Sequence, residues 1–268
     1  MKSAPFDRVA ADYDRQFTDT PVGRLQRARV HRLLDQLLTT PALDHVLEFS
    51  CGTGADARWL AQRGCHVLAT DSSQGMIATA REKTAHWSFP SPAPTFRVLP
   101  FERLHELELE RPVDLVLSNF GGLNCLSPEA LREWGQGLAP QIRPGGYLAA
   151  VVMGRFCAWE TAYFLLKGNW SRAWRRRSKG PVLADLGDGA SIATWYYSPR
   201  EFARHCGAHF SVVAIRPIGL AVPPSYLDPW FRRRPGWLQR LAYWEARWGE
   251  RAWGAGLADH YWILLRRS

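Results

Sequence analysis

The sequence lacks the segments that mark membrane-spanning and exported chains. No uncharged run approaches the roughly 18 residues that a spanning helix needs. The opening "MKSAPFDRVAADYDRQF" carries a charge every few residues, so it contains no apolar core of a signal peptide. By elimination, we predict a cytoplasmic location.

Cysteine is also scarce, and its spacing fits neither a cross-link nor a metal site. The 5 cysteines are widely spaced, and none belongs to a C-x-x-C pair. An odd number at such spacing argues against both a disulfide framework and a zinc site. We therefore expect reduced, mostly buried thiols and no metal.

The chain has no internal repeat and no linker-like tract, so one domain with insertions is expected for its 268 residues. Charge is unevenly divided along it. Lys and Arg number 16 against 17 Asp and Glu in residues 1–154, and 18 against 8 in residues 155–268. Ten of the 13 tryptophans also lie in the second part. We interpret this as a core followed by a substrate-specific elaboration.

Apolar runs alternate with amphipathic segments through the first part of the chain. Strands are expected at 45–49, 66–70, 95–99, 113–119 and 145–154, with helices at 55–64, 72–84 and 127–140. Two further strands, at 209–219 and 259–267, follow a predicted hairpin at 181–197 that turns at Gly187, Asp188 and Gly189. Near-continuous apolar strands separated by helices indicate a doubly wound parallel sheet.

A glycine turn between the first strand and its helix indicates a ligand. In "EFSCGTG" (48–54) the glycines remove β-carbons, and the following helix offers free N–H groups. Asp71 ends the next strand, where an acid can accept both ribose hydroxyls. A purely structural turn and a nicotinamide dehydrogenase are the alternatives, although the dehydrogenase fingerprint would have glycine in place of Ala57.

The segments "LEFSCGTG", "ATDSSQGM", "VDLVLSNFGGLN" and "IRPGGYLAAVV" resemble motifs of class I S-adenosylmethionine-dependent methyltransferases. The resemblance runs from about residue 44 to 154 and recurs at 195–216 and 258–267. It implies an α/β fold with a doubly wound, seven-stranded Rossmann-like methyltransferase sheet, a C-terminal antiparallel strand and cap insertions. It also implies methyl transfer, with S-adenosyl-L-methionine as the cofactor.

The same resemblance divides the single domain, 1–268, into functional segments. They are N-terminal cofactor-covering helices (1–43), a cofactor-binding core (44–154), substrate cap insertions (155–198 and 220–257) and the remaining core strands (199–219 and 258–268). The residues expected to bind the cofactor are Tyr13, Arg29, Glu48, Ser50, Gly52, Gly54, Asp71, Ser72, Met76, Phe101, Ser118, Asn119 and Phe120. Pro100 stands where many relatives have an aspartate for the adenine amine, so we assign Phe101 a stacking contact and leave the hydrogen bond to Glu102 or to backbone.

Two of these cofactor residues have open alternatives. Arg29 lies inside an apolar helical stripe at 22–37, where a buried cation needs an anion such as the cofactor carboxylate. It can instead reach solvent at the edge of the stripe. Tyr13 is equally compatible with a hydroxyl contact to the ligand and with plain packing.

The acceptor is expected beyond the strand ends, beside "SNFGGLNC". Asn119, Glu160 and His260 are the candidate catalytic residues, although positioning alone can suffice for methyl transfer. By the same resemblance, Phe156, Trp159 and Glu160 fall where relatives build the acceptor pocket, and the alternative for them is a helix start with buried aromatics. For His260 the alternative is a structural histidine.

Two basic, tryptophan-rich stretches call for a partner or a packing role. Residues 167–180 hold six cations and no acid, and residues 236–252 place Trp237, Leu241, Trp244 and Trp248 at helical spacing. A lid packed on its own domain, a membrane-surface face and a nucleic-acid surface are the alternatives. Membrane-surface contact is favoured over nucleic acid because the aromatic residues follow a helical register and not a strand platform.

These observations together predict an enzyme that methylates a small, apolar or lipid-like acceptor. An RNA methyltransferase using the basic C-terminal surface is the rival enzyme. The non-enzyme alternative is a cofactor-binding protein without turnover.

Overall fold

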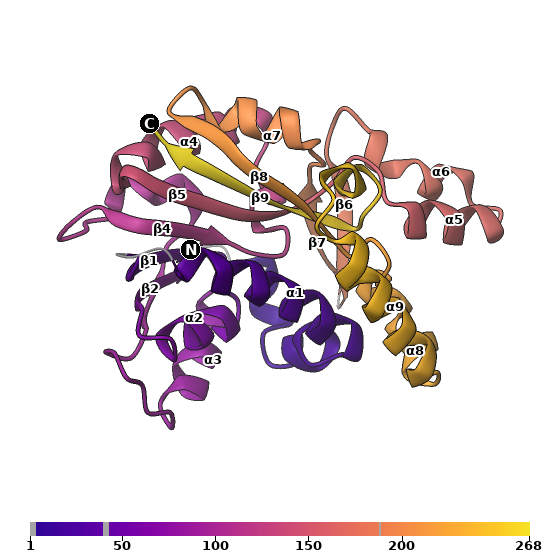
Figure 1. The fold of residues 1–268 in the computed structure, drawn as a ribbon, viewed down its shortest axis with the longest axis horizontal. Coiled ribbons are helices and arrows are strands. Elements are labelled where there is room, and N and C mark those ends of the chain that lie inside the picture. The colour runs from indigo at the N-terminus through magenta and orange to yellow at the C-terminus, as the bar shows by residue number, and fades with distance from the viewer. Residues whose placement is uncertain (1–3, 40–42, 188) are drawn as a thin grey trace.

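The computed structural model describes residues 4–39, 43–187 and 189–268. Seven strands form one sheet in the order β3-β2-β1-β4-β5-β9-β8 (Figure 1). Their bounds are β1 His45–Phe49, β2 His66–Asp71, β3 Thr95–Val98, β4 Val113–Ser118, β5 Ile142–Met153, β8 Phe210–Ile218 and β9 His260–Arg267. Strand β9 runs antiparallel to both of its neighbours, while the pairs among β1 to β5 are parallel. This topology confirms the predicted α/β sheet with its C-terminal antiparallel strand.

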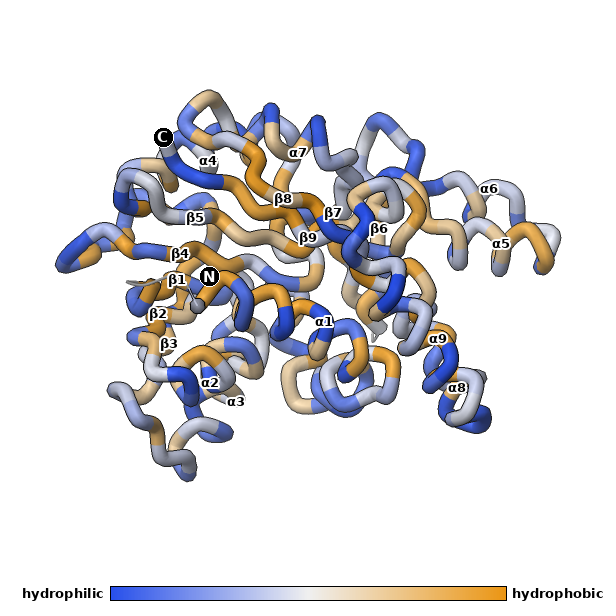
Figure 2. Tube along the Cα trace, viewed as in Figure 1, coloured by the Kyte–Doolittle hydropathy of each residue, from blue (hydrophilic) through white to orange (hydrophobic). Residues whose placement is uncertain are grey.

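Helices cover both faces of the sheet. The helices α1 (Pro21–Leu38), α2 (Ala55–Ala61) and α3 (Gln74–Thr84) lie on one face, and α4 (Pro128–Leu138) and α7 (Pro199–Cys206) lie on the other (Figure 1). Each face has its own apolar core: residues such as Leu34 and Leu60 pack in one, and Trp134 and Phe202 pack in the other. The strands are accordingly apolar along most of their length (Figure 2). Burial on both faces explains why they read as continuous apolar runs.

Local signals in the sequence fix where these helices begin. The side chains of Thr20, Ser73, Ser127 and Ser198 each accept a hydrogen bond from an N–H in the first turn of α1, α3, α4 and α7 respectively. Proline occupies the first turn of α1, α4 and α7, where its missing N–H costs nothing. These caps place the strand-to-helix loops at the carboxyl edge of the sheet.

Several helices of the tryptophan-rich second part project beyond that edge (Figure 1). They are α5 (Ala158–Leu166), α6 (Trp170–Ala173), α8 (Asp228–Arg232) and α9 (Pro235–Trp248). A separate antiparallel pair, β6 (Val182–Gly187) and β7 (Ala190–Thr194), confirms the predicted hairpin, although Asp188 at its turn lies outside the described residues. Short helical turns at Pro5–Arg8 and Asp14–Thr18 precede α1 and approach the same edge.

Within the described residues, every helix is too short or too polar to cross a lipid bilayer. The cytoplasmic location stays a prediction from the sequence.

Candidate functional site

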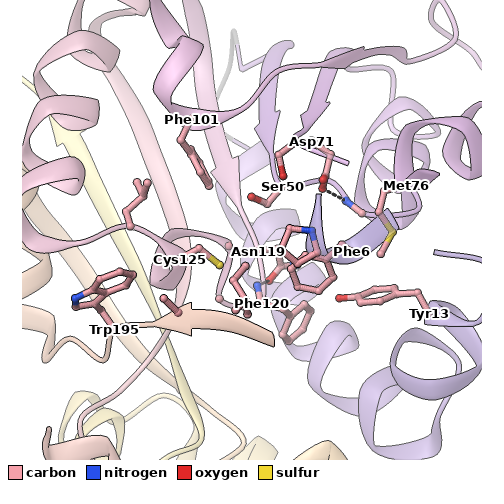
Figure 3. A pocket seen from close by; sticks show the side chains of 18 of the residues that line it. Phe6, Tyr13, Ser50, Asp71, Met76, Phe101, Asn119, Phe120, Cys125 and Trp195 are labelled. Atoms are coloured by element: carbon pink, nitrogen blue, oxygen red, sulfur yellow. Dashed lines mark hydrogen bonds between the residues drawn. The ribbon is translucent and has the colours of Figure 1, made fainter. Parts of the chain in front are cut away.

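A cavity of ≈ 290 Å³ opens at the carboxyl ends of β1, β2 and β4 (Figure 3). Nine of the residues expected to bind a cofactor line it: Tyr13, Ser50, Gly52, Asp71, Ser72, Met76, Phe101, Asn119 and Phe120. Pro5, Phe6, Ile192, Ala193 and Trp195 close it from the N-terminal turn and the hairpin. The sequence motifs therefore converge on one site, which we call the first cavity.

The glycine turn approaches this cavity through backbone that β-carbons disfavour. Gly52 and Gly54 have φ of 53° and 77°, in the left-handed region. A β-carbon on Gly54 would lie 2.9 Å from the Phe96 ring. Ser50 and Phe120 are the non-glycine residues with positive φ, at 55° and 47°, within the described chain. Such strained conformations gather at ligand sites, and here they flank one cavity.

Asp71 fixes the turn from the neighbouring strand. Its Oδ2 accepts a hydrogen bond from Gly52 N at 2.9 Å, and its Oδ1 accepts one from Ser73 N at 2.9 Å. The residue is 8% exposed, and burial raises the pKa of its carboxyl. Each carboxylate oxygen retains acceptor capacity toward the first cavity. Asp71 can thus hold the glycine turn and bind hydroxyl groups of a ligand at once.

Glu48 lies beneath the first cavity, in β1, with an unsatisfied oxygen. Its Oε2 has no hydrogen-bond partner among the residues that the structure describes. Burial together with the nearby Asp56 raises the pKa of its carboxyl well above the ordinary value. The Ser118 hydroxyl, at the end of β4, is buried and equally unpartnered. Buried polar atoms are rarely left unpaired. Together they suit a ligand with a cationic, hydrogen-bonding end.

A buried polar cluster that the sequence reasoning missed lies beside Glu48. Arg27 and His31 of α1 and Asn119 after β4 all bond to the Asp56 carboxylate, the last two at 2.7 and 2.8 Å. Burial raises the pKa of Asp56, but the Arg27 charge and the His31 bond outweigh it, so the pKa is lowered. Arg27 and His31, four residues apart on one helix face, were the available signal.

Arg29 is not brought to this cluster. Its side chain is 3% exposed and donates at 2.7 Å to Gly249 O and at 2.7 Å to Glu250 Oε1. It lines neither the first cavity nor its neighbour. Arg27 is the α1 arginine at the site: its guanidinium carbon lies 4.9 Å from the centroid of the Phe120 ring, and its Nε is buried without a partner.

The far end of the first cavity is aromatic and apolar. The Phe101 ring stacks on Phe49 with centroids 5.7 Å apart, and Met76, which also lines the cavity, is buried. Glu102 also lines the cavity. This end offers one exposed acid and an aromatic face, as expected for a chain that has Pro100 in the position of the usual aspartate.

A second cavity of ≈ 290 Å³ adjoins the first. The two share the lining residues Phe6, Tyr13, Phe120, Gly121, Cys125 and Ile192. The second cavity continues toward α5, the hairpin and the start of β9, where Glu160 and His260 line it. Two of the three predicted catalytic residues therefore lie in the second cavity, and Asn119 lies in the first.

Glu160 is held in an ion-pair cluster. Both of its oxygens accept from Arg175 at 2.9 Å, and Oε2 also accepts from Arg176 at 3.0 Å. Burial raises the pKa of this carboxyl, but the two arginines outweigh it and the pKa is lowered. A carboxylate that is ionised and fully bonded is poorly suited to proton transfer. This geometry favours a role in holding the two arginines.

His260 is placed differently. Its Nδ1 lies 3.2 Å from Asp259 Oδ2, and its ring meets the Phe120 ring edge-on with centroids 5.8 Å apart. Asp259 in turn accepts from Arg176 at 2.7 Å. No hydrogen bond engages His260 Nε2 within the described chain, so this nitrogen is available at the junction of the two cavities.

Three residues predicted near the acceptor, Asn124, Phe156 and Trp159, line neither of the two cavities. Asn124 is fully buried, and its side-chain amide bonds to Met153 and Trp195 backbone. Trp159 donates through Nε1 to Ala221 O at 3.1 Å, and neither Trp159 nor Phe156 lines a described cavity at this edge.

Comparison with known proteins agrees with this geometry. Residues 46–146 match the sequence model of a methyltransferase domain family. Among curated relatives, a demethylmenaquinone methyltransferase of Clavibacter sepedonicus is 32% identical over 147 residues, 54% of each chain. A malonyl-[acyl-carrier protein] O-methyltransferase of Pectobacterium atrosepticum is 35% identical over 150 residues, 55% of this chain and 51% of that protein.

A solved structure extends the likeness to the whole fold. The CcbJ methyltransferase of Streptomyces caelestis aligns with a TM-score of 0.63 at 17% identity, covering 100% of this chain and 99% of that one. The chain spans about half the length of the curated relatives it matches.

Proposed function

We propose that this chain, which carries a class I S-adenosylmethionine-dependent methyltransferase domain, transfers a methyl group to a small, apolar or lipid-like acceptor. The observation that carries the proposal is the pair of adjoining cavities, which meet at Tyr13 and Phe120. One contains the glycine turn and Asp71, and the other contains the unoccupied His260 nitrogen. A donor and an acceptor held in adjoining cavities that share lining residues can bring their reacting atoms together, as group transfer requires.

The residues of the first cavity fit the cofactor, S-adenosyl-L-methionine, group by group. The Asp71 carboxylate suits the two ribose hydroxyls, and Phe101 and Met76 suit the adenine ring. Two residues beside this cavity would complete the fit: the Glu48 oxygen and the Arg27 Nε, both without a partner among the described residues, suit the amino group and the carboxylate of the methionine end, with Arg27 lining the adjoining second cavity. When bound, the cofactor supplies an electrophilic methyl group on a sulfonium. The protein then has to orient the acceptor atom and exclude water.

The relatives favour a small-molecule acceptor in general terms. Their names specify demethylmenaquinone and malonyl-[acyl-carrier protein] as substrates of those proteins. For this chain we propose an acceptor of the same broad kind, with residues 155–198 and 220–257 acting as caps over it. The cap residues Glu160, Arg175, Tyr196 and Tyr226 line the second cavity and support this role.

Two arginines of α1 provide a matched test of the cofactor pose. Arg27→Met should weaken S-adenosylhomocysteine binding about tenfold or more, because a charge-assisted bond of roughly 1.5 to 3 kcal/mol is lost. Arg29→Met should leave that affinity within about twofold, since Arg29 bonds to Gly249 and Glu250 away from both cavities. Calorimetric titration of S-adenosylhomocysteine onto both variants measures these affinities. Equal losses, or a loss confined to Arg29→Met, would overturn the assignment.

We further propose that α8, α9 and the turn after them form a membrane-surface face. Its exposed aromatic residues are Trp230, Trp237, Tyr243, Trp244, Trp248 and Trp253, and its exposed cations are Arg232, Arg233, Arg234, Arg240, Arg247 and Arg251. Both acids between residues 230 and 253 are engaged by the protein: Glu245 accepts from the Gly219, Ala221 and Val222 amides, and Glu250 pairs with Arg29 and Arg216. The outward face therefore combines indoles with cations, as interfacial helices do.

This face predicts binding to anionic vesicles. The wild-type protein should sediment with phosphatidylserine-containing vesicles at low salt, because each cation near the surface contributes about 1 kcal/mol. Replacing both Trp244 and Trp248, which stack with centroids 4.7 Å apart, by serine should reduce the bound fraction severalfold. Trp87→Ser, an exposed indole of the first part, is the control. Absence of vesicle binding by the wild type, or salt-dependent RNA binding in its place, would contradict this face.

A further inference from the structure

The cations of the second cavity are all paired within the protein. Arg27, Arg175 and Arg176 line it, and they bond to Asp56, to Glu160, and to Glu160 and Asp259 respectively. Burial lowers the pKa of the Arg176 guanidinium, but Asp259 and Glu160 outweigh it, so the group stays charged. Positive and negative groups therefore balance within the cavity wall.

This balance bears on the charge of the acceptor. Once the cofactor carboxylate occupies Arg27 Nε as proposed above, a carboxylate or phosphate entering the second cavity would find no further arginine or lysine that lacks a carboxylate partner among the described lining residues. It would also meet the carboxylates of Glu160, Asp185 and Asp259. Moving an anion from water into such a site is costly without a free cation. An uncharged molecule meets no such penalty.

The remaining wall of the second cavity indicates the shape of that molecule. Phe6, Phe17, Phe120, Tyr196 and Tyr226 line it, with Ile192 and Leu186 from the hairpin. Aromatic side chains in such number bind flat rings by stacking and edge-to-face contact. The wall suits an aromatic acceptor better than a flexible chain.

The Nε2 atom of His260, at the junction of the two cavities, can accept a proton. Arg176 holds Asp259, and Asp259 Oδ2 faces His260 Nδ1 at 3.2 Å. The two atoms form no hydrogen bond at this geometry, but the negative charge of Asp259 favours a positive charge on the ring when Nε2 accepts a proton. His260 also contacts Phe120, which lines both cavities. Its Nε2 therefore lies where an acceptor atom must meet the donor.

We propose, resting on the function above, that the acceptor is an uncharged phenol and that His260 removes its hydroxyl proton during methyl transfer. The O–H proton passes to His260 Nε2, and the electron pair left on oxygen forms the new O–C bond. The S–C bond of the donor breaks and its electron pair stays on sulfur, which becomes a neutral thioether. The imidazolium then releases its proton to water. Asp259 is a positioning residue in this scheme.

Chromogenic probes test the proposal without turnover. 4-Nitrophenol, 4-nitroanisole and 4-nitrobenzoate are titrated onto the wild-type protein with S-adenosylhomocysteine present. Nitrophenol should bind saturably and at least about tenfold more tightly than nitrobenzoate, because only the latter must enter as an anion. Nitrobenzoate binding as tightly as nitrophenol, or no saturable nitrophenol binding, overturns the phenol assignment.

The absorption spectrum of bound 4-nitrophenol reports whether its hydroxyl group is ionised. Bound nitrophenol should show a larger ionised fraction than free nitrophenol at the same pH, by about tenfold in the ratio of ionised to neutral form. His260→Gln should abolish this gain while keeping S-adenosylhomocysteine affinity, and His105→Gln, at an exposed site, should keep it. An unchanged spectrum in His260→Gln overturns the role of the histidine. Failure of S-adenosylhomocysteine to bind the wild type would instead contradict the proposed function itself.

Discussion

Asp71→Ala should reduce the affinity for S-adenosylhomocysteine by at least about 100-fold. Two ribose hydroxyls would lose a charged acceptor, and hydrogen bonds to charged groups contribute roughly 1.5 to 3 kcal/mol each. The same change leaves the N–H groups of Gly52 and Ser73 without their present partner, so the glycine turn loses its anchor as well. Isothermal titration calorimetry measures the affinity of the variant and of the parent for S-adenosylhomocysteine.

Two further variants make this result specific. Asp71→Asn keeps the shape of the side chain and one acceptor oxygen, so its loss should be intermediate. Asp35→Ala removes an exposed acid that pairs with Arg63, far from the cavities in the fold, and should leave the affinity unchanged. A folded Asp71→Ala protein with parental affinity would show that Asp71 is no cofactor ligand.

Arg176→Met should lower the free energy of unfolding by about 3 to 5 kcal/mol at neutral pH, because the buried Asp259 carboxylate loses its arginine and Glu160 keeps only Arg175. Glu160 and Asp259 both bond to this arginine, and both are buried. Arg177→Met is the matched control, because Arg177 is the next residue in the chain and is exposed. Urea unfolding followed by circular dichroism measures the difference.

The pH dependence of the same variant has a definite sign. In the parent, burial raises the pKa values of Glu160 and Asp259, but their cationic partners outweigh it and both pKa values are lowered. Their contribution to stability is therefore present above the ordinary carboxyl pKa and is lost as pH falls toward the folded-state values. Without Arg176 both pKa values should rise, although Arg175 still bonds to Glu160 and His260 still faces Asp259, so the penalty should shrink as the pH falls through the variant's carboxyl pKa values. A penalty that grows on acidification would contradict the ion-pair account.

The cofactor side of the site was largely predictable because it is local in sequence. The turn at 48–54 and Asp71 lie on adjacent parallel strands, and the carboxyl ends of such strands meet at one edge. The alternation of apolar runs and capped helices indicated the parallel sheet, and the structure supplies its strand order. Nine predicted residues consequently line one cavity.

The choice between two arginines was not predictable in the same way. Arg29 lies in the apolar stripe, and a buried cation there suggested a bound anion. Residues 27 and 29 are two positions apart, about 200° around a helix, so they face nearly opposite directions. The structure supplies the anion of Arg29 from Glu250, which is 221 residues away in the chain. Such a partner leaves no local signal.

The second cavity likewise depends on contacts between residues that are separated in the sequence. The run of six cations at 167–180 read as one basic surface, yet Arg175 and Arg176 turn inward to Glu160 and Asp259. Charge counts along the sequence do not show which cations are paired. The same limit applies to α9, whose tryptophans are exposed while Leu238 and Glu245 face inward. Helical spacing alone left open which side was buried.

The most direct test of the central claim is a parallel titration of the wild-type protein with S-adenosylhomocysteine and with NADH. Both ligands carry an adenosine ribose that an acid such as Asp71 can bind, but only the first has the amino-acid end that suits Glu48 and Arg27. We predict one saturable site for S-adenosylhomocysteine, displaced by S-adenosylmethionine, and no saturable binding of NADH. Saturable NADH binding with none for S-adenosylhomocysteine would contradict the assignment and favour a dehydrogenase site.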